Sequence, residues 1–386
     1  MVSDINLFFE PVAPGLLENP VTGTLGARIE ANVGNEFPEI DKGTVAMFSV
    51  AEYRGSDIQV DKRYGDEVRN ELYSLKDHFG SLRIVDFGTI QPGETVKDTY
   101  YAVSTVVADV VKQGGIIILL GGSQDLTYAN YLAYEKLEQV VNLVSVDSRF
   151  DIGDVEDEVQ HDRYLQRIIL HQPNILFNYS NLAFQTHHVQ FKEVDLMKKM
   201  YFDTYRLGEV QADLENVEPV VRNADIVSFD MTTIRSSDFP SNVLSEPNGL
   251  YGEEACAISR YAGLSDKLSS FGLYNGSFTG DNQSSKLTAQ ILWYFLSGFA
   301  NRKKDYPFAD KEVYTKYIVT LENGSYDVVF YKSDRSDRWW MEVPYPSKRG
   351  EKYQRHFMVP CNYGDYTKAC EGEIPDRWWQ TFQKLG

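Results

Sequence analysis

The sequence predicts an α/β protein in three layers, with a mainly parallel sheet between two layers of helices and a small aromatic-rich extension at the C-terminus. Short, almost continuously apolar segments alternate with stretches of helical periodicity through about residue 300, which is typical of parallel strands buried on both faces. The character then changes, and four of the five tryptophans follow residue 300. At 386 residues, the chain can form one large domain, expected at 1–300, and an appendage at 301–386.

Each element of the α/β domain follows from its local pattern. The segments expected to be strands are apolar and short, and they are residues 43–50, 82–87, 115–121, 141–146, 174–178, 224–230 and 268–274. The stretches expected to be helices are residues 98–112, 128–138, 252–262 and 285–300. In a parallel sheet of this kind, ligands bind beyond the C-terminal ends of the strands.

The C-terminal segment predicts a β-hairpin followed by a terminal helix. Residues 314–322 and 326–331 flank Asn323-Gly324, a dipeptide that favours the tight turn of a hairpin. Pro375 precedes a stretch with apolar residues at helical spacing, which indicates a helix that begins there and runs to the end of the chain.

The tetrapeptide Asp-Arg-Trp-Trp occurs twice in the extension, at 337–340 and 376–379. The rings are expected to form the core of the extension or to dock it on the α/β domain. A second interpretation is a partner-binding surface, because tryptophan and arginine dominate protein interfaces. The residues considered for that surface are Arg338, Trp339, Trp340, Arg377, Trp378 and Trp379.

Composition excludes several classes of function. Lys and Arg total 38 against 56 Asp and Glu, a net charge of -18. This acidity argues against nucleic acids and anionic membranes as partners, since both require basic patches. No segment reaches the roughly 20 apolar residues that cross a bilayer, and no signal peptide precedes the first strand. With 3 cysteines, few for this length, a reducing compartment is indicated, and we expect a cytoplasmic protein.

Three motifs lie at predicted strand ends. They are Gly121-Gly-Ser-Gln124-Asp125, Ser145-Val-Asp147-Ser-Arg149-Phe-Asp151 and Ser228-Phe-Asp230-Met-Thr232. Alternation along an extended strand would place Asp147, Arg149 and Asp151 on one face. Two carboxylates beside a histidine would suit a divalent cation. The guanidinium that stands there instead repels such an ion.

The order and spacing of these motifs resemble the ureohydrolase family, which includes arginase, agmatinase and formimidoylglutamase. That family carries GGDH, DAHxD and SFDxD motifs whose His and Asp side chains hold two manganese ions. The resemblance covers roughly residues 40–300. It implies the three-layer αβα arginase-like fold, hydrolysis of linear amidines and guanidines, and assembly into homo-oligomers.

Carried over position by position, the resemblance implies a degenerate metal site. The two histidine positions fall on Gln124 and Arg149, and one aspartate position falls on Thr232. The positions that keep a ligand are Asp147, Asp151 and Asp230. The glutamate that contacts substrate in the family corresponds to Leu273.

We hypothesise that Arg149 replaces the metal ions as the counter-charge of the aspartates. A planar guanidinium can bridge two carboxylates with charge-assisted hydrogen bonds. Removing it from a buried cluster, as in Arg149→Ala, would then cost about 3–5 kcal/mol.

The sequence therefore predicts a catalytically inactive ureohydrolase-like pseudoenzyme that needs no cofactor and acts as a protein-binding or scaffold component. Hydroxide generation in the family depends on the metals, and Arg149, Thr232 and Leu273 cannot replace them. The alternative is a divergent C–N hydrolase of formimidoylglutamase or arginase type. That enzyme would use Mn²⁺ held by Asp147, Asp151 and Asp230.

Overall fold

The computed structural model describes residues 5–56, 64–153, 160–277, 282–306, 313–321, 327–344 and 351–385. We refer to residues 1–300 as the body and to residues 301–386 as the extension. The strands of the body are β1 (Phe9–Glu10), β2 (Glu30–Ala31), β3 (Val45–Val50), β4 (Ile84–Ile90), β5 (Ile116–Leu120), β6 (Val141–Val146), β7 (Leu176–Phe184), β8 (Asp203–Arg206), β9 (Ile226–Asp230) and β10 (Ser270–Tyr274).

These ten strands form one sheet in the order β1-β4-β3-β5-β10-β9-β6-β7-β8, with β2 also paired to β4. Only β1 runs antiparallel to its neighbour, and the other ladders are parallel. The central strands β5, β6 and β9 are buried at every residue, as their continuous apolar sequences predict. The arginase-like fold expected from the sequence is confirmed.

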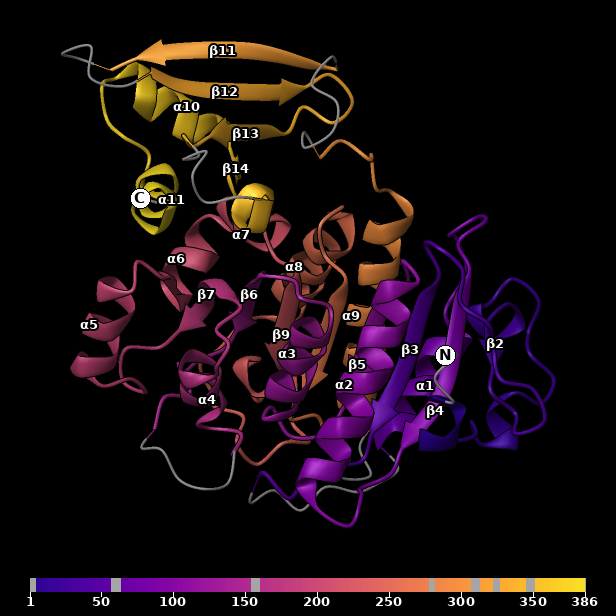
Figure 1. Ribbon diagram of the computed structural model, residues 1–386. Coiled ribbons are helices and arrows are strands. Elements are labelled where there is room, and N and C mark those ends of the chain that lie inside the picture. The colour runs from indigo at the N-terminus through magenta and orange to yellow at the C-terminus, as the bar shows by residue number, and fades with distance from the viewer. Residues whose placement is uncertain are drawn as a thin grey trace.

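Helices cover both faces of this sheet (Figure 1). Their bounds are α1 (Tyr64–Ser74), α2 (Val96–Lys112), α3 (Leu126–Lys136), α4 (Tyr164–Leu170), α5 (Phe191–Lys199), α6 (Leu207–Ala212), α7 (Val217–Arg222), α8 (Gly252–Leu264) and α9 (Gln283–Ala300). Helices α1, α6, α7, α8 and α9 share one hydrophobic core with the sheet. Helices α2, α3, α4 and α5 share the core on the other face.

Helices α8 and α9 pack closely because glycines lie at their contact. A Cβ atom added at Gly263 would lie 2.1 Å from the Phe295 carbonyl oxygen, and one added at Gly298 would lie 2.2 Å from that of Arg260. Neither position leaves room for a larger residue without moving a helix. None of the helices in the described ranges is both long and apolar enough to traverse a bilayer.

The extension contains an antiparallel sheet with the order β11-β12-β13-β14. Its elements are β11 (Tyr314–Thr320), β12 (Asp327–Ser333), β13 (Trp339–Glu342), β14 (Met358–Cys361), α10 (Tyr363–Cys370) and α11 (Asp376–Leu385). Strands β11 and β12 form the predicted hairpin, while its Asn323-Gly324 turn lies outside the described residues. The predicted terminal helix is α11.

The extension docks at the N-terminal ends of the body strands, at the top of Figure 1. The Arg355 guanidinium lies 3.0 Å from Asp225, the residue immediately before β9. His356 stacks on Phe177, near the start of β7, with ring centroids 4.2 Å apart. The predicted metal-site positions lie at the opposite, C-terminal ends of the strands, following β5, β6 and β9.

Candidate functional site

Two glycines form the turn after β5 and place Gln124 at the C-terminal ends of the central strands. Gly121 and Gly122 have φ angles of +82° and +75°, a region that favours glycine. A Cβ atom at Gly122 would also lie 2.1 Å from Leu126. The turn leaves Gln124 fully buried, and its Nε2 amide donates to the Oδ2 atom of Asp147 across 2.8 Å.

Asp147 is the centre of the site. Besides the Gln124 bond, its Oδ1 atom accepts from the main-chain N–H of Arg149 at 2.8 Å. It is 1% exposed, and burial raises the pKa of its carboxyl group against the opposing effect of these hydrogen bonds. A further hydrogen bond joins the carboxyl groups of Asp147 and Asp151.

Asp151 is the more perturbed member of that pair. Burial, followed by the charge of Asp147, raises the pKa of Asp151 well above its usual range. Its Oδ2 atom is buried and has no hydrogen-bond partner among the described residues.

Asp230 ends β9 and caps the short helical turn that follows it. Its Oδ1 atom accepts from the N–H of Thr232 at 2.8 Å, and the Thr232 side chain also bonds to it. Burial, together with the charge of Asp147, raises the pKa of Asp230 to about 7. The structure thus brings together five of the predicted positions, which are Gln124, Asp147, Asp151, Asp230 and Thr232.

The predicted role of Arg149 is wrong. Its side chain is exposed, and among the described residues its guanidinium forms no ion pair with Asp147, Asp151 or Asp230. Its charge lowers the pKa of Asp147, but only as the smallest of the effects on that carboxyl group. The physical reason is that β6 ends at Val146, so strand alternation does not continue through residue 151. The main-chain groups of Arg149 hold the turn instead, since its carbonyl accepts from Asn181 at 2.8 Å.

Leu273 lies within β10 and is fully buried in the hydrophobic core between β5 and β9. It therefore provides no polar group at the strand ends. No sequence pattern indicated Tyr164 on α4, whose hydroxyl lies 3.3 Å from Gln124 Nε2 and 3.0 Å from Ser145 Oγ. A lone tyrosine distant in sequence from all three motifs could not have been assigned to the site.

At three of the metal positions implied by the resemblance, this chain has Gln124, Arg149 and Thr232 where the family motifs have histidine, histidine and aspartate. Among the described residues, no group of three or more His, Cys, Asp or Glu side chains has the arrangement of metal ligands. N–H groups of Gln124, Arg149 and Thr232 are directed at the oxygens of Asp147 and Asp230. N–H donors at these oxygens compete with cations for the same lone pairs.

The Asp-Arg-Trp-Trp residues lie in the extension and do not form a common surface. Trp339, Trp340 and Trp378 are 8%, 1% and 1% exposed, so the partner-surface interpretation is wrong for these three rings and the core interpretation is confirmed. Trp379 alone among the four remains partly exposed, at 43%. The arginines are engaged too, Arg338 with Glu218 and Arg377 with Asp365.

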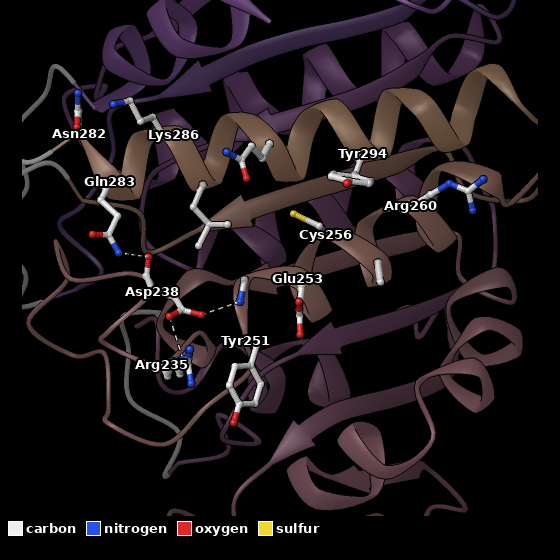
Figure 2. A pocket seen from close by; sticks show the side chains of 14 residues that line it. Arg235, Asp238, Tyr251, Glu253, Cys256, Arg260, Asn282, Gln283, Lys286 and Tyr294 are labelled. Carbon is white, nitrogen blue, oxygen red and sulfur yellow. Dashed lines mark hydrogen bonds and ion pairs between the residues drawn. The ribbon is translucent and has the colours of Figure 1, made fainter.

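A groove of about 870 Å³ lies between α8 and α9, away from the carboxylates (Figure 2). Arg235 closes one end, where it pairs with Asp238 at 2.9 Å and stacks on Tyr251. Arg260 and Tyr294 lie at the other end. The groove contains none of the residues predicted from the three motifs.

The similarity to known proteins lies in the body of the chain. Residues 58–297 match the family described as the arginase family. The formimidoylglutamase of Staphylococcus haemolyticus is 25% identical over 284 residues, which cover 69% of this chain and 90% of that protein. One from Staphylococcus aureus is 24% identical over 253 residues, covering 60% and 77%.

Solved structures share the fold. The formiminoglutamase of Trypanosoma cruzi with Mn²⁺ superposes with a TM-score of 0.62 at 18% identity, covering 67% of this chain and 94% of that one. The agmatine ureohydrolase of Thermoplasma volcanium gives a TM-score of 0.58 at 19% identity, covering 74% and 97%. The extension lies beyond the residues that match the family.

Proposed function

The chain belongs to the arginase family, and we propose that it is a member that has lost the two-metal hydrolysis and serves as a protein-binding or scaffold component. The hydrogen bond from Gln124 to Asp147, at 2.8 Å, carries the proposal. It directs an N–H group at the carboxylate oxygen that a cation would otherwise contact, and an N–H group cannot ligate a metal. The residue at the first-motif ligand position therefore stabilises the aspartate without an ion.

The other replacements support the same conclusion. Hydrolysis in a metal-dependent enzyme requires an ion that lowers the pKa of bound water. Gln124 and Thr232 are neutral, and the guanidinium of Arg149 is a permanent donor that cannot serve as a general base. Leu273 is apolar and buried. None of these four side chains can produce a hydroxide nucleophile at neutral pH.

A second candidate function is a divergent metal-dependent C–N hydrolase, as the names of the formimidoylglutamase relatives suggest. Two buried oxygens favour it, because Asp151 Oδ2 and Gln124 Oε1 both lack a hydrogen-bond partner among the described residues. In this enzyme Asp147, Asp151 and Asp230 would hold one Mn²⁺ through oxygen donors. The bound ion would supply Lewis acidity and an activated water.

Metal analysis of the full chain distinguishes the two functions. The protein is expressed with Mn²⁺ in the medium, purified without chelator and analysed by inductively coupled plasma mass spectrometry. The proposal expects manganese well below one ion per chain and no hydrolysis of linear amidines or guanidines. Stoichiometric manganese with amidine hydrolysis would overturn it in favour of the second candidate.

Restoring the family ligands provides a matched comparison. The triple variant Gln124→His, Arg149→His and Thr232→Asp recreates the donor set of the resemblance, and Asp230→Asn in the same background is its control. If ligand loss is the reason for inactivity, the triple variant binds Mn²⁺ more tightly than the native chain, and the control loses that gain. Stoichiometric Mn²⁺ binding by the native chain, equal to that of the triple variant, would contradict the proposal.

A further inference from the structure

Two rows of side chains, one from each helix, line the groove between α8 and α9 (Figure 2). Helix α8 supplies residues 252, 256 and 260, and helix α9 supplies residues 286, 290 and 294. Each row repeats every four residues, so its members lie on one face of their helix. The helices run in the same direction, because Gly252 lies beside Leu287 and Gly263 lies beside Phe295. Each row therefore extends over about 12 Å of the groove, at a rise of about 1.5 Å per residue.

The floor of the groove is apolar and its rim is polar. Cys256 is 7% exposed, and Ala257 and Leu287 are half-buried, whereas Lys286 and Gln290 on the rim are exposed. Burial raises the pKa of the Cys256 thiol to about 12, so this side chain stays neutral and acts as a packing surface rather than as a nucleophile. An apolar floor with a charged rim is the composition of a peptide-binding groove.

The charge that the groove presents to a ligand is mainly positive. Arg235 and Asp238 neutralise each other in an ion pair of 2.9 Å, and the Asp238 carboxylate also accepts from the main-chain N–H of residue 252 at 2.9 Å. Lys286 and Arg260 are exposed, and among the described residues neither forms an ion pair. The remaining acidic side chain of the lining is Glu253. A chain with a net charge of -18 thus has a groove in which cations outnumber carboxylates.

The spacing of the two unpaired cations indicates the kind of occupant. Lys286 begins the α9 row and Arg260 ends the α8 row, so they lie about 12 Å apart along the groove. A single phosphate or carboxylate is too small to contact both. An extended peptide advances about 3.3 Å per residue, so acidic residues four positions apart match this distance and share one face of the strand. A second copy of the chain does not fit through the same surface, because two facing grooves leave each other unfilled.

We propose that this groove binds an extended acidic peptide segment of a partner protein, with one carboxylate at Lys286 and a second, four residues away, at Arg260. The residue midway between them lies on the same face of the peptide, and a small apolar side chain there packs over Cys256. Tyr294, 39% exposed on the rim, adds an aromatic contact of the kind enriched in interfaces. The inference rests on the proposed function as a protein-binding component and names the chemistry of its partner.

Fluorescence anisotropy with the full chain tests the site. The probe is a fluorescein-labelled peptide with glutamate at its first and fifth positions and alanine and valine between them. The control peptide has the same composition with its glutamates adjacent. The native chain should bind the probe at least about fivefold more tightly than the control, and added salt should weaken the binding. Equal affinity for the two peptides, or no binding at about millimolar concentration, overturns the proposal.

Charge variants at exposed positions locate the binding on the protein. Lys286→Glu and Arg260→Glu should each weaken probe binding about fivefold, because each replaces an attraction by a repulsion. Glu253→Gln should strengthen it, because it removes the opposing carboxylate. Lys192→Glu, at an exposed position on α5, changes the net charge equally and should leave the affinity unchanged. If Lys192→Glu weakens binding as much as the groove variants do, the attraction comes from the overall charge and the groove is not the site.

A charge exchange tests the pairing of each carboxylate. Two further probes carry lysine in place of the first or of the fifth glutamate. One of them, and not both, should bind Lys286→Glu more tightly than it binds the native chain. Restored binding of neither probe, or of both, means that Lys286 does not contact a single peptide position, and the assigned register is wrong.

Two other outcomes separate this inference from its alternatives. A native dimer in sedimentation equilibrium that Lys286→Glu converts to a monomer would show that a second copy covers the groove, and would overturn the peptide site. Absence of peptide binding in a chain that also holds no manganese overturns the groove site alone and leaves the loss of hydrolysis in place. Stoichiometric manganese with amidine hydrolysis overturns the proposed function instead, so the two proposals fail separately.

Discussion

The guanidinium of Arg222, at the end of α7, lies 4.4 Å from the ring centroid of Trp340 on β13. The same side chain donates to the carbonyl oxygens of Trp339 and Cys361 at 3.2 and 3.1 Å and pairs with Glu218 at 2.9 Å. One buried arginine of the body thus holds two strands of the extension. This contact connects the segment that matches the arginase family with the segment that does not.

Arg222→Ala is expected to loosen the extension. The substitution removes a donor from two buried carbonyls and leaves Glu218 with Arg338 as its remaining cationic partner, which costs about 3–5 kcal/mol for a buried ionic contact. Urea unfolding measures the loss, and limited proteolysis should cut between residues 300 and 314 sooner than in the native chain. A variant with native stability and native proteolysis would contradict the assigned role of Arg222.

Arg149→Ala is expected to leave the stability nearly unchanged, in contrast to the sequence-based hypothesis. The side chain is exposed, and the two hydrogen bonds of Arg149 come from main-chain groups that alanine retains. The melting temperature should shift by less than about 1 °C, as for most surface substitutions. Asp147→Ala serves as the comparison, because it removes the acceptor of both N–H groups and should lower the melting temperature clearly.

Because of His356, the free energy of unfolding is expected to decrease in mild acid. Burial, followed by the charge of Lys267, holds the pKa of His356 well below its usual range, and Arg355 and Lys384 add to this effect. The folded state then binds fewer protons than the unfolded state below about pH 6.5, so this contribution is present above that pH and is lost as the pH falls.

The test compares how the urea midpoints of two proteins change with pH. Urea midpoints of the native chain and of His356→Phe, which keeps a ring against Phe177, are compared at pH 7.5 and pH 5.5. The native midpoint should drop further than that of the variant. If the urea midpoints of the two proteins fall by the same amount between pH 7.5 and pH 5.5, His356 does not contribute to the pH dependence of the stability, and the prediction is wrong.

Two glycines on helices should respond to alanine in opposite directions. At Gly298 the new methyl would meet the Arg260 carbonyl of α8 at 2.2 Å, whereas at Gly208 on α6 nothing lies within 4 Å. Gly298→Ala should therefore destabilise the protein by about 1–3 kcal/mol through overpacking. Gly208→Ala should stabilise it by up to about 1 kcal/mol through helix propensity. Equal effects in thermal unfolding would indicate that α8 and α9 can separate freely.

The sequence predicted the body well because buried parallel strands are almost entirely apolar. All seven expected segments contain strands, from β3 to β10, although β8 was missed. Its sequence, Asp203-Thr-Tyr-Arg206, is polar and lies at the sheet edge with partial exposure, so no apolar run marks it. The prediction that Gln124, Asp147 and Asp230 lie close together also agrees with the structure. Each follows or ends a parallel strand, and the C-terminal ends of parallel strands meet at one edge of the sheet.

The repeated tetrapeptide shows where local sequence is insufficient. The first Trp-Trp pair, Trp339-Trp340, lies in strand β13, whereas Trp378-Trp379 lies in helix α11. Pairing with β12 and β14 selects the extended form of the first copy. Only tertiary contacts distinguish these identical segments. Arg149 was misjudged for a related reason, because the end of β6 cannot be read from alternation alone.

The docking of the extension at the N-terminal ends of β7 and β9 has a consequence for the carboxylate cluster. Asp225 and Asp230 mark the two ends of the β9 segment, with Arg355 of the extension at the first and the carboxylate cluster at the second. A substitution that loosens the contact of Arg355 with Asp225 therefore acts on the edge of the sheet opposite the cluster, and it can be combined with a substitution in the cluster as an independent perturbation.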